Sequence, residues 1–113
     1  MVGAKGATFL KEDASMQIAP SIVNKIWQIA STKGFDSYFI NQKGAGITDD
    51  HLPVIINRKI PMIDIIDQKI SGNQTFFDHW HTHQDTIENI DRNTLEAVGE
   101  TIIQTIYLEN GTI

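Results

Sequence analysis

Three of the four histidines stand at alternate positions, His79, His81 and His83, beside Trp80 and ahead of Asp85. In an extended backbone alternate side chains point to the same side, so the spacing predicts that the three imidazoles share one face. Imidazole nitrogen is a common zinc ligand, but one strand supplies only part of a tetrahedral site. The competing interpretation is a polar loop around a half-buried tryptophan. Because the chain has no cysteine, any further ligands would be His, Asp or Glu.

Two other polar groups interrupt apolar surroundings. Asp49 and Asp50 precede His51, and helix capping explains one aspartate of this pair but neither both nor the histidine. Asp64 lies within the apolar segment 60–67, where a carboxylate needs a partner or becomes protonated. It could also mark the point where a strand emerges from the core. If the fold gathers these groups with the histidines, they form a site for a metal and for proton transfer.

The composition limits the class of protein. The 113 residues suit one domain or a piece of a larger one, and 41% hydrophobic with 20% charged residues is typical of a soluble globular chain. A net charge of -5, with no cluster among the nine Lys and Arg, argues against a nucleic-acid partner. We find no apolar run long enough for a membrane span and no signal-peptide pattern. Met1-Val2 resembles the end of a strand, so a truncated chain is expected.

Helical periodicity and turn residues define the expected elements. Pro20 opens a helix with Trp27 beside its apolar stripe and Gly34 just past its end. A second, short helix opens near Pro53, with Asp50 as a cap. A last helix begins after Asp91 or Asn93 and ends at Asn110-Gly111, with an apolar face of Leu95, Val98, Ile102 and Ile106, widened by Ile103 and Tyr107.

Strands are expected between these helices. Residues 37–40 are aromatic and β-branched, and residues 60–67 have the near-continuous apolar pattern of a strand buried on both faces. Residues 3–19, 41–46 and 70–77 are expected to be loops. The pattern predicts an α/β fold, part of a mixed, mostly parallel sheet flanked by helices, over a single segment 1–113. The buried strand needs neighbours that this sequence scarcely provides, which indicates a missing N-terminal part or a partner chain.

Three segments in order resemble the C-terminal part of the zinc aminopeptidase and glutaminyl cyclase superfamily. They are Ile-Thr-Asp-Asp-His-Leu-Pro (47–53), Ile-Pro-Met-Ile-Asp (60–64), and Trp-His-Thr (80–82) followed by Asp-Thr (85–86) and Glu-Asn-Ile-Asp (88–91). The resemblance extends from about Val2 to the final helix. It implies the phosphorylase/hydrolase-like sandwich of the zinc exopeptidases, with its N-terminal part absent.

The resemblance also implies roles for individual residues. The position of His81 is that of a zinc ligand, and Trp80 corresponds to a tryptophan that lines the substrate pocket of glutaminyl cyclases. Asp49 corresponds to an aspartate of their proton-transfer network, and aminopeptidases more often have serine there, which favours the cyclase branch. Asp64 stands where animal cyclases usually carry histidine, so its catalytic role is a hypothesis. No family role carries over to His79 or His83.

The implied function is that of a C-terminal fragment of a zinc-dependent glutaminyl-peptide cyclotransferase, which converts an N-terminal glutamine to pyroglutamate. The fragment is expected to be inactive alone, because the other zinc ligands and the general base would precede it. One alternative is a fragment of a zinc-dependent, leucyl-type aminopeptidase. Another is a non-catalytic domain that completes its sheet by homo-oligomerisation through an exposed edge. The expected partners of the complete enzyme are peptide N-termini, and relatives suggest a periplasmic or extracellular location.

Overall fold

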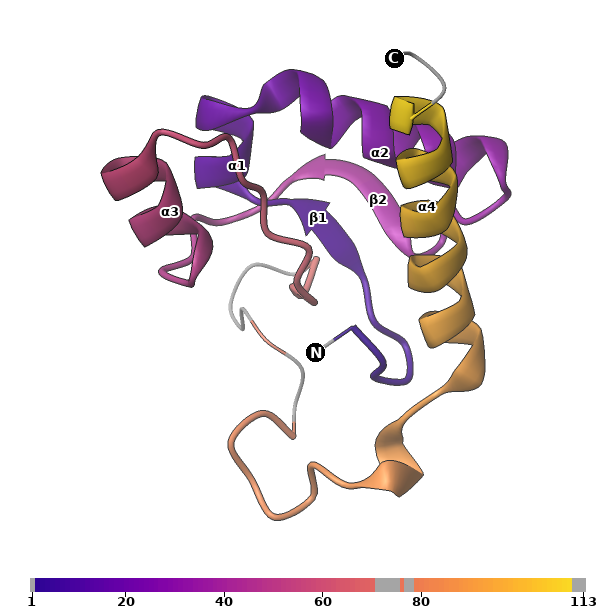
Figure 1. The fold of residues 1–113 in the computed structure, drawn as a ribbon. Helices are drawn as coiled ribbons and strands as arrows, with labels where there is room; N and C mark the ends of the chain where they lie inside the picture. Colours follow the sequence, from indigo (N-terminus) through magenta and orange to yellow (C-terminus); the bar gives the residue numbers. More distant parts are fainter. Residues whose placement is uncertain (1, 71–75, 77–78, 111–113) are drawn as a thin grey trace.

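The computed structural model describes residues 2–70, 76 and 79–110, and its helices surround a two-stranded parallel sheet (Figure 1). Phe9 lies opposite Phe39 and Lys11 opposite Lys43. This arrangement confirms the α/β class. The elements in chain order are β1 (Phe9–Lys11), α1 (Asp13–Ile18), α2 (Pro20–Thr32), β2 (Phe39–Lys43), α3 (His51–Arg58), the 3-10 helix η1 (Ile87–Asn89) and α4 (Arg92–Asn110).

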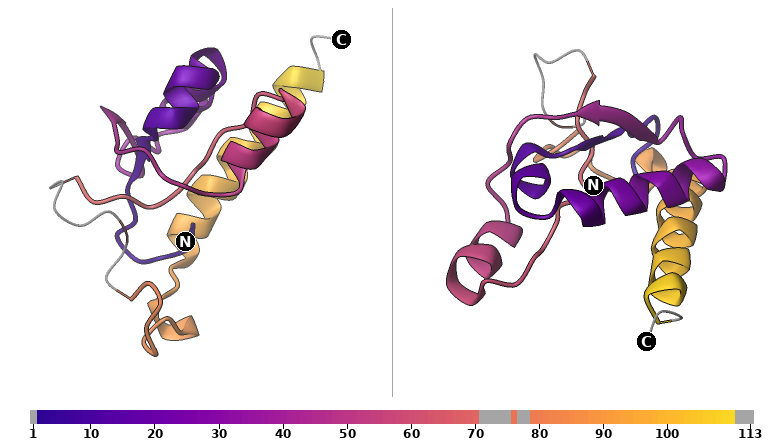
Figure 2. Two further views of the ribbon diagram at one scale, coloured as in Figure 1. Left: turned by 90° about the vertical axis from the view of Figure 1, so that its left-hand side faces the viewer. Right: turned by 90° about the horizontal axis from the view of Figure 1, so that it is seen from above.

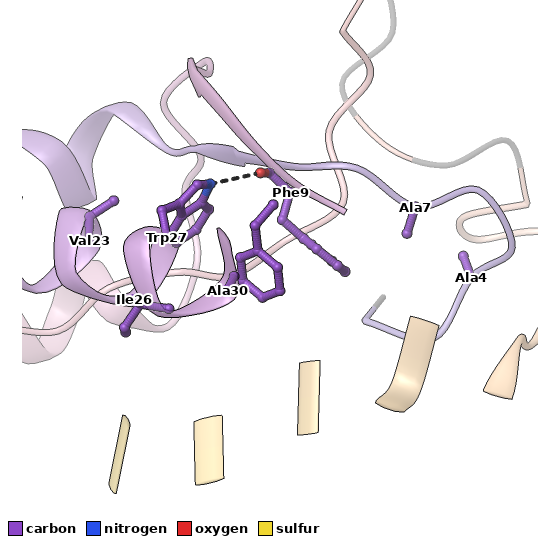
Figure 3. Packing of buried hydrophobic residues seen from close by; sticks show 8 residues of the cluster. Ala4, Ala7, Phe9, Val23, Ile26, Trp27 and Ala30 are labelled. Carbon is purple, nitrogen blue, oxygen red and sulfur yellow. Dashed lines mark hydrogen bonds between the residues drawn. The ribbon is translucent and has the colours of Figure 1, made fainter. Parts of the chain in front are cut away.

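The core lies between α2 and the sheet. Trp27 is 4% exposed, and its ring meets that of Phe39 edge to face with centroids 5.1 Å apart. Its indole N–H donates to the carbonyl oxygen of Phe9 at 3.1 Å (Figure 3), and also to that of Ile40 at 3.0 Å. One side chain of α2 thus bonds to both strands, which confirms the predicted packing of Trp27. The other members of this cluster are Ala4, Ala7, Val23, Ile26 and Ala30.

The two long helices follow the prediction closely. Helix α2 begins at Pro20, and Gly34 just beyond it has φ +84°, a left-handed conformation that glycine adopts without steric cost. At the start of α4 the Asp91 carboxylate accepts a hydrogen bond from the Asn93 N–H at 3.0 Å, as expected for a cap. The helix extends to Asn110, and Gly111 lies outside the described residues.

The buried face of α4 differs in part from the predicted one, although Val98 packs against the core as expected. Thr94, Ala97 and Thr101 are 0% exposed, whereas Leu95 is 45% and Ile106 61% exposed. Small side chains let α4 approach its neighbours closely, and the Thr94 hydroxyl donates to the Ala4 carbonyl oxygen at 3.0 Å. Over the part of the chain that the structure describes, Ile103 and Tyr107 also face outward.

Two other predictions about the N-terminal half need correction. Residues 3–19 contain β1 and α1 instead of a single loop, since the Glu12 side chain caps α1 and stabilises its first turn. The predicted strand 37–40 is shifted to 39–43, because pairing with Lys11 extends β2 into residues expected to be loop.

The predicted buried strand 60–67 is also wrong for this structure. The segment forms only an isolated antiparallel bridge between Phe9 and Asp67, and Ile60 is 56% exposed. A strand requires a hydrogen-bonded ladder with a neighbour, and the described residues provide just that bridge. Most of the loop expected at 70–77 lies outside the described residues, as does Met1.

Helices α3 and α4 lie at opposite ends of the molecule, as Figure 1 and the right-hand view of Figure 2 show. The segment 79–91 lies on the side of the sheet away from α2. None of the described helices is long and apolar enough to cross a membrane.

Candidate active site

A fully buried carboxylate, Glu12, lies between β1 and α1, and the sequence analysis did not single it out. Its side chain is 0% exposed and accepts hydrogen bonds from the backbone N–H groups of Ala14 (2.8 Å), Ser15 (3.0 Å) and Ile47 (3.0 Å). The Ser15 hydroxyl donates to it at 2.7 Å. Burial alone would raise the pKa of Glu12, but these hydrogen bonds outweigh burial and hold the pKa below its usual value. Glu12 is therefore a carboxylate at neutral pH.

His51 connects this carboxylate to a second acidic residue. The imidazole is 2% exposed, and its Nε2 lies 2.8 Å from Oε1 of Glu12. On the other side of the ring, Nδ1 lies 3.9 Å from Oδ2 of Asp64. Nδ1 of His51 and Oδ2 of Asp64 are both buried, and neither has a hydrogen-bond partner in the described part of the chain. The histidine that capping did not explain thus stands between two carboxyl groups.

Asp64 and Asp49 form a pair of carboxyl groups next to this histidine. Their side chains are hydrogen-bonded to each other, and the Asp64 backbone N–H donates to the Ser15 hydroxyl at 2.9 Å. Burial, the charges of Asp49 and Glu12, and the hydrogen bond to Asp49 raise the pKa of Asp64 to about 6, although His51 opposes the shift. With a pKa of about 6, Asp64 takes up and releases a proton close to neutral pH. The structure therefore brings together the two residues predicted to be catalytic.

The loop before α3 presents Asp49 to this site. The Asp49 carboxylate accepts a hydrogen bond from the Asp50 N–H at 2.8 Å, and its carbonyl accepts one from the Leu52 N–H at 3.1 Å. Asp50 occupies the N-cap position of α3, as predicted, but its side chain makes no capping hydrogen bond. Capping thus accounts for the position of Asp50 and leaves Asp49 for the carboxyl pair.

The histidine stretch forms turns instead of a strand, so the predicted common face of His79, His81 and His83 is wrong. The Thr82 N–H and hydroxyl both donate to the His79 carbonyl oxygen, at 3.0 and 2.7 Å. His81 itself has φ +56°. These turns reverse the chain within a few residues, and the period of two that applies to an extended backbone is lost.

Trp80 and His81 form a separate aromatic unit. Their rings stack with centroids 3.9 Å apart and planes 17° from parallel, and Phe76 packs against Trp80 at 4.6 Å. Trp80 is 39% exposed, so its ring is available to a ligand. No hydrogen bond, ion pair or ring contact among the described residues joins this unit to Asp49 or Asp64. The predicted site residues therefore form two separate pairs.

The predicted zinc site is represented here by one donor. The imidazole of His81 is of the right chemical type for zinc. However, no group of at least three His, Cys, Asp or Glu side chains in the described residues could hold a metal ion. These residues alone do not fit a complete zinc site, and the remaining ligands would have to come from outside them.

Comparisons with known proteins are consistent with this geometry. The glutaminyl cyclase of Porphyromonas gingivalis is 48% identical and superimposes with a TM-score of 0.93 over 96% of this chain and 40% of that chain. A Zn-dependent exopeptidase of Parabacteroides distasonis is also 48% identical, with a TM-score of 0.91 over 95% of this chain and 37% of that one. Bovine glutaminyl-peptide cyclotransferase is 36% identical over 73 residues, which are 64% of this chain and 18% of that protein.

This chain therefore spans less than half the length of these relatives. Zinc in the parent protein is implied by the family and by the exopeptidase relatives. Residues 1–106 match peptidase family M28. The chain belongs to peptidase family M28, and its structural neighbours are bacterial glutaminyl cyclases and zinc exopeptidases.

Proposed function

We propose that this chain is part of a zinc-dependent glutaminyl-peptide cyclotransferase that converts the N-terminal glutamine of peptides to pyroglutamate. The observation that carries the proposal is the hydrogen-bonded pair of Asp49 and Asp64, in which the pKa of Asp64 is raised to about 6. Such a pair both accepts and donates a proton near neutral pH. Similarity to solved glutaminyl cyclases supports the same reaction.

Cyclisation requires a proton to move between two nitrogens. The α-amine forms a bond to the side-chain amide carbon, the bond from that carbon to its amide nitrogen breaks, and ammonia leaves. The amine must lose a proton and the departing nitrogen must gain one. The pair of Asp49 and Asp64 would belong to the network that relays this proton to the leaving group, together with a general base from outside these residues. Because nucleophile and electrophile belong to one residue, the remaining task is orientation.

In this proposal the aromatic unit of Trp80 and His81 would bind the substrate and the metal. The exposed ring of Trp80 offers an apolar face to the glutaminyl side chain, and His81 would be one ligand of the metal. Zinc, when bound in the complete protein, supplies Lewis-acid polarisation of the amide carbonyl oxygen.

An aminopeptidase is the alternative within the same family, because one solved neighbour, 42% identical, is described as a leucine aminopeptidase precursor of Bacteroides thetaiotaomicron. That reaction activates water and also delivers a proton to the departing amine, so the carboxyl pair is compatible with both reactions. The aspartate at position 49, where aminopeptidases more often have serine, favours the cyclase. The substrate assay below separates the two reactions.

The test is a chimera of the Porphyromonas gingivalis enzyme in which this chain replaces the matching segment. With a glutaminyl peptide we expect pyroglutamate formation, and with a leucyl peptide no cleavage. Asp64→Asn and Asp49→Asn should each lower kcat by roughly a hundredfold, whereas Asp36→Asn, the same substitution at an exposed aspartate, should leave kcat unchanged. Cleavage of the leucyl peptide without cyclisation would refute the cyclase assignment.

Zinc binding is tested in the same chimera by measuring bound metal after dialysis. His81→Ala should lose the metal, and His83→Ala, a substitution of another exposed histidine of the same segment, should retain it. Retention of stoichiometric zinc by the His81→Ala variant would contradict the assignment of His81 as a ligand.

A further inference from the structure

The proposed function leaves the buried pair of Glu12 and His51 without a role. Glu12 is 0% and His51 2% exposed, and removing a carboxylate and an imidazole from water has a large desolvation cost. Capping α1 needs an acceptor for two backbone N–H groups, and it does not require a histidine on the same carboxylate. The second ring nitrogen of His51 points toward Asp64, the residue proposed to hold the proton.

We propose that Glu12 and His51 are positioning residues that fix the Asp64 carboxyl group in the orientation that faces Asp49. The inference rests on the proposed function, since it gives this pair a purpose in presenting the proton-holding carboxyl group.

Glu12 controls Asp64 through two separate links that start from one oxygen atom. Oε1 of Glu12 accepts the Ser15 hydroxyl at 2.7 Å, and the same hydroxyl oxygen accepts the Asp64 backbone N–H at 2.9 Å. Oε1 also lies 2.8 Å from Nε2 of His51, whose Nδ1 faces Oδ2 of Asp64. The first link holds the main chain of Asp64, and the second limits the rotation of its side chain.

The two partners of His51, Glu12 and Asp64, indicate which ring nitrogen carries a hydrogen. Glu12 is ionised and can only accept, so Nε2 of His51 carries a hydrogen that it donates to Oε1. A second hydrogen, on Nδ1, would be directed at Oδ2 of Asp64, and the resulting positive charge of the ring is what lowers the pKa of Asp64. A closer approach of these two atoms, which stand 3.9 Å apart, places one proton between them. One oxygen of Asp64 would thereby be held by His51 while the carboxyl group remains bonded to Asp49.

The charged and titratable groups that face Asp64 come from three parts of the fold: Asp49 from the loop before α3, His51 from the first turn of α3, and Glu12 from the junction of β1 and α1. The two carboxylates raise the pKa of Asp64, and His51 lowers it. Removing the imidazole therefore has a defined sign, an increase in the pKa of Asp64.

The experiment is an NMR titration of this chain with its carboxyl carbons and histidine nitrogens labelled. In the unmodified chain the Nδ1 signal of His51 should change with the same midpoint as the Asp64 carboxyl carbon. In His51→Gln, whose amide nitrogen can still reach Glu12, the midpoint of Asp64 should rise by roughly one unit. His83→Gln, an exposed histidine changed in the same way, should leave it unchanged.

A purely structural role for His51 predicts a different result. The variant would be less stable, but the Nδ1 signal of the unmodified chain would not follow Asp64, and this outcome would overturn the proposal. The measurement on the unmodified chain stands even if His51→Gln does not fold.

Activity of the chimera separates this inference from the proposed function. If both hold, His51→Gln lowers kcat by roughly tenfold or more with little change in KM, because the substrate still binds but the carboxyl group is misplaced. Coupled titration in a chimera that does not cyclise would refute the function and leave the positioning role intact. Full cyclase activity in His51→Gln would refute the positioning role alone.

Discussion

Replacement of Glu12 by glutamine tests the central buried carboxylate with almost no change in shape. In the native chain one carboxylate oxygen accepts the N–H groups of Ala14 and Ile47, at 2.8 and 3.0 Å. The other accepts the Ser15 N–H and hydroxyl and faces Nε2 of His51. An amide has only one oxygen, so its NH₂ group must point at one of these sets of donors.

The loss of unfolding free energy in Glu12→Gln is estimated from the smaller of these two sets of donors. With the amide oxygen toward Ser15 and His51, the NH₂ group faces the two backbone N–H groups of Ala14 and Ile47. Each buried donor that loses its acceptor costs about 1–3 kcal/mol, so the variant should lose about 4 kcal/mol of unfolding free energy. That is a large part of the roughly 5–15 kcal/mol that holds a domain folded.

The assay is urea unfolding followed by circular dichroism at pH 7. With an unfolding slope of about 2 kcal/mol per M, the midpoint should fall by roughly 2 M. Glu96→Gln, the same substitution at an exposed glutamate of α4, is the control and should change the midpoint little. A loss of less than about 1 kcal/mol of unfolding free energy in Glu12→Gln would refute the reasoning, because two buried donors without acceptors should destabilise the fold by more than that.

The pH dependence provides a second check on the same variant. The pKa of Glu12 is lowered in the folded state, so its contribution to stability is present above the unfolded pKa of about 4.3 and lost as pH falls through the folded value. The difference between the native chain and Glu12→Gln should therefore shrink as the pH drops below about 4. A difference that stays constant down to pH 2 would show that the charge of Glu12 is not the cause.

Three further substitutions have defined outcomes. The folded pKa of Asp64, about 6, exceeds its unfolded value, so its stabilising contribution is complete below about pH 4 and lost as pH rises through 6. Asp64→Asn should consequently gain about 2–3 kcal/mol relative to the native chain between pH 4 and 7.5 in urea unfolding, and no relative gain would refute the shift. Trp27→Phe removes the donor to two strand carbonyls and should cost about 2–4 kcal/mol in the same assay. Gly44→Ala would collide with the Gln68 side chain and bring its Cβ to 2.9 Å from that of Leu10, so thermal unfolding should reveal a loss of about 1–3 kcal/mol.

Local sequence signals predicted the helices best. Pro20 and Gly34 delimit α2, and Asp91 caps α4, because proline at a helix start, glycine beyond its end and an acidic cap act within a few residues. The family motifs also pointed to Asp49 and Asp64, which the structure places in contact. The helix ends have their physical cause in neighbouring residues, and the two aspartates belong to motifs that can be recognised in the sequence.

Local signals did not determine which face of α4 is buried, or that residues 60–67 form no strand beyond one bridge. An apolar stripe says which side chains can be buried, but the neighbouring elements decide which are, and here α4 packs through Thr94, Ala97 and Thr101. The segment 60–67 has strand-like residues, yet a strand exists only where a second chain segment supplies the ladder. The period of two in the histidine stretch failed for a related reason, because the bonds from Thr82 to His79 close a turn.

Glu12 shows most clearly what only the tertiary structure decided. Glutamate is not among the preferred capping residues, and nothing around it in the sequence indicates burial. Its importance arises from His51, 39 positions away, and from the Ile47 N–H, 35 positions away. The sequence by itself determined the family, the main helices and the pair of aspartates. The link between that pair and a buried carboxylate depended on the folded chain, because hydrogen bonds across such separations leave no local pattern.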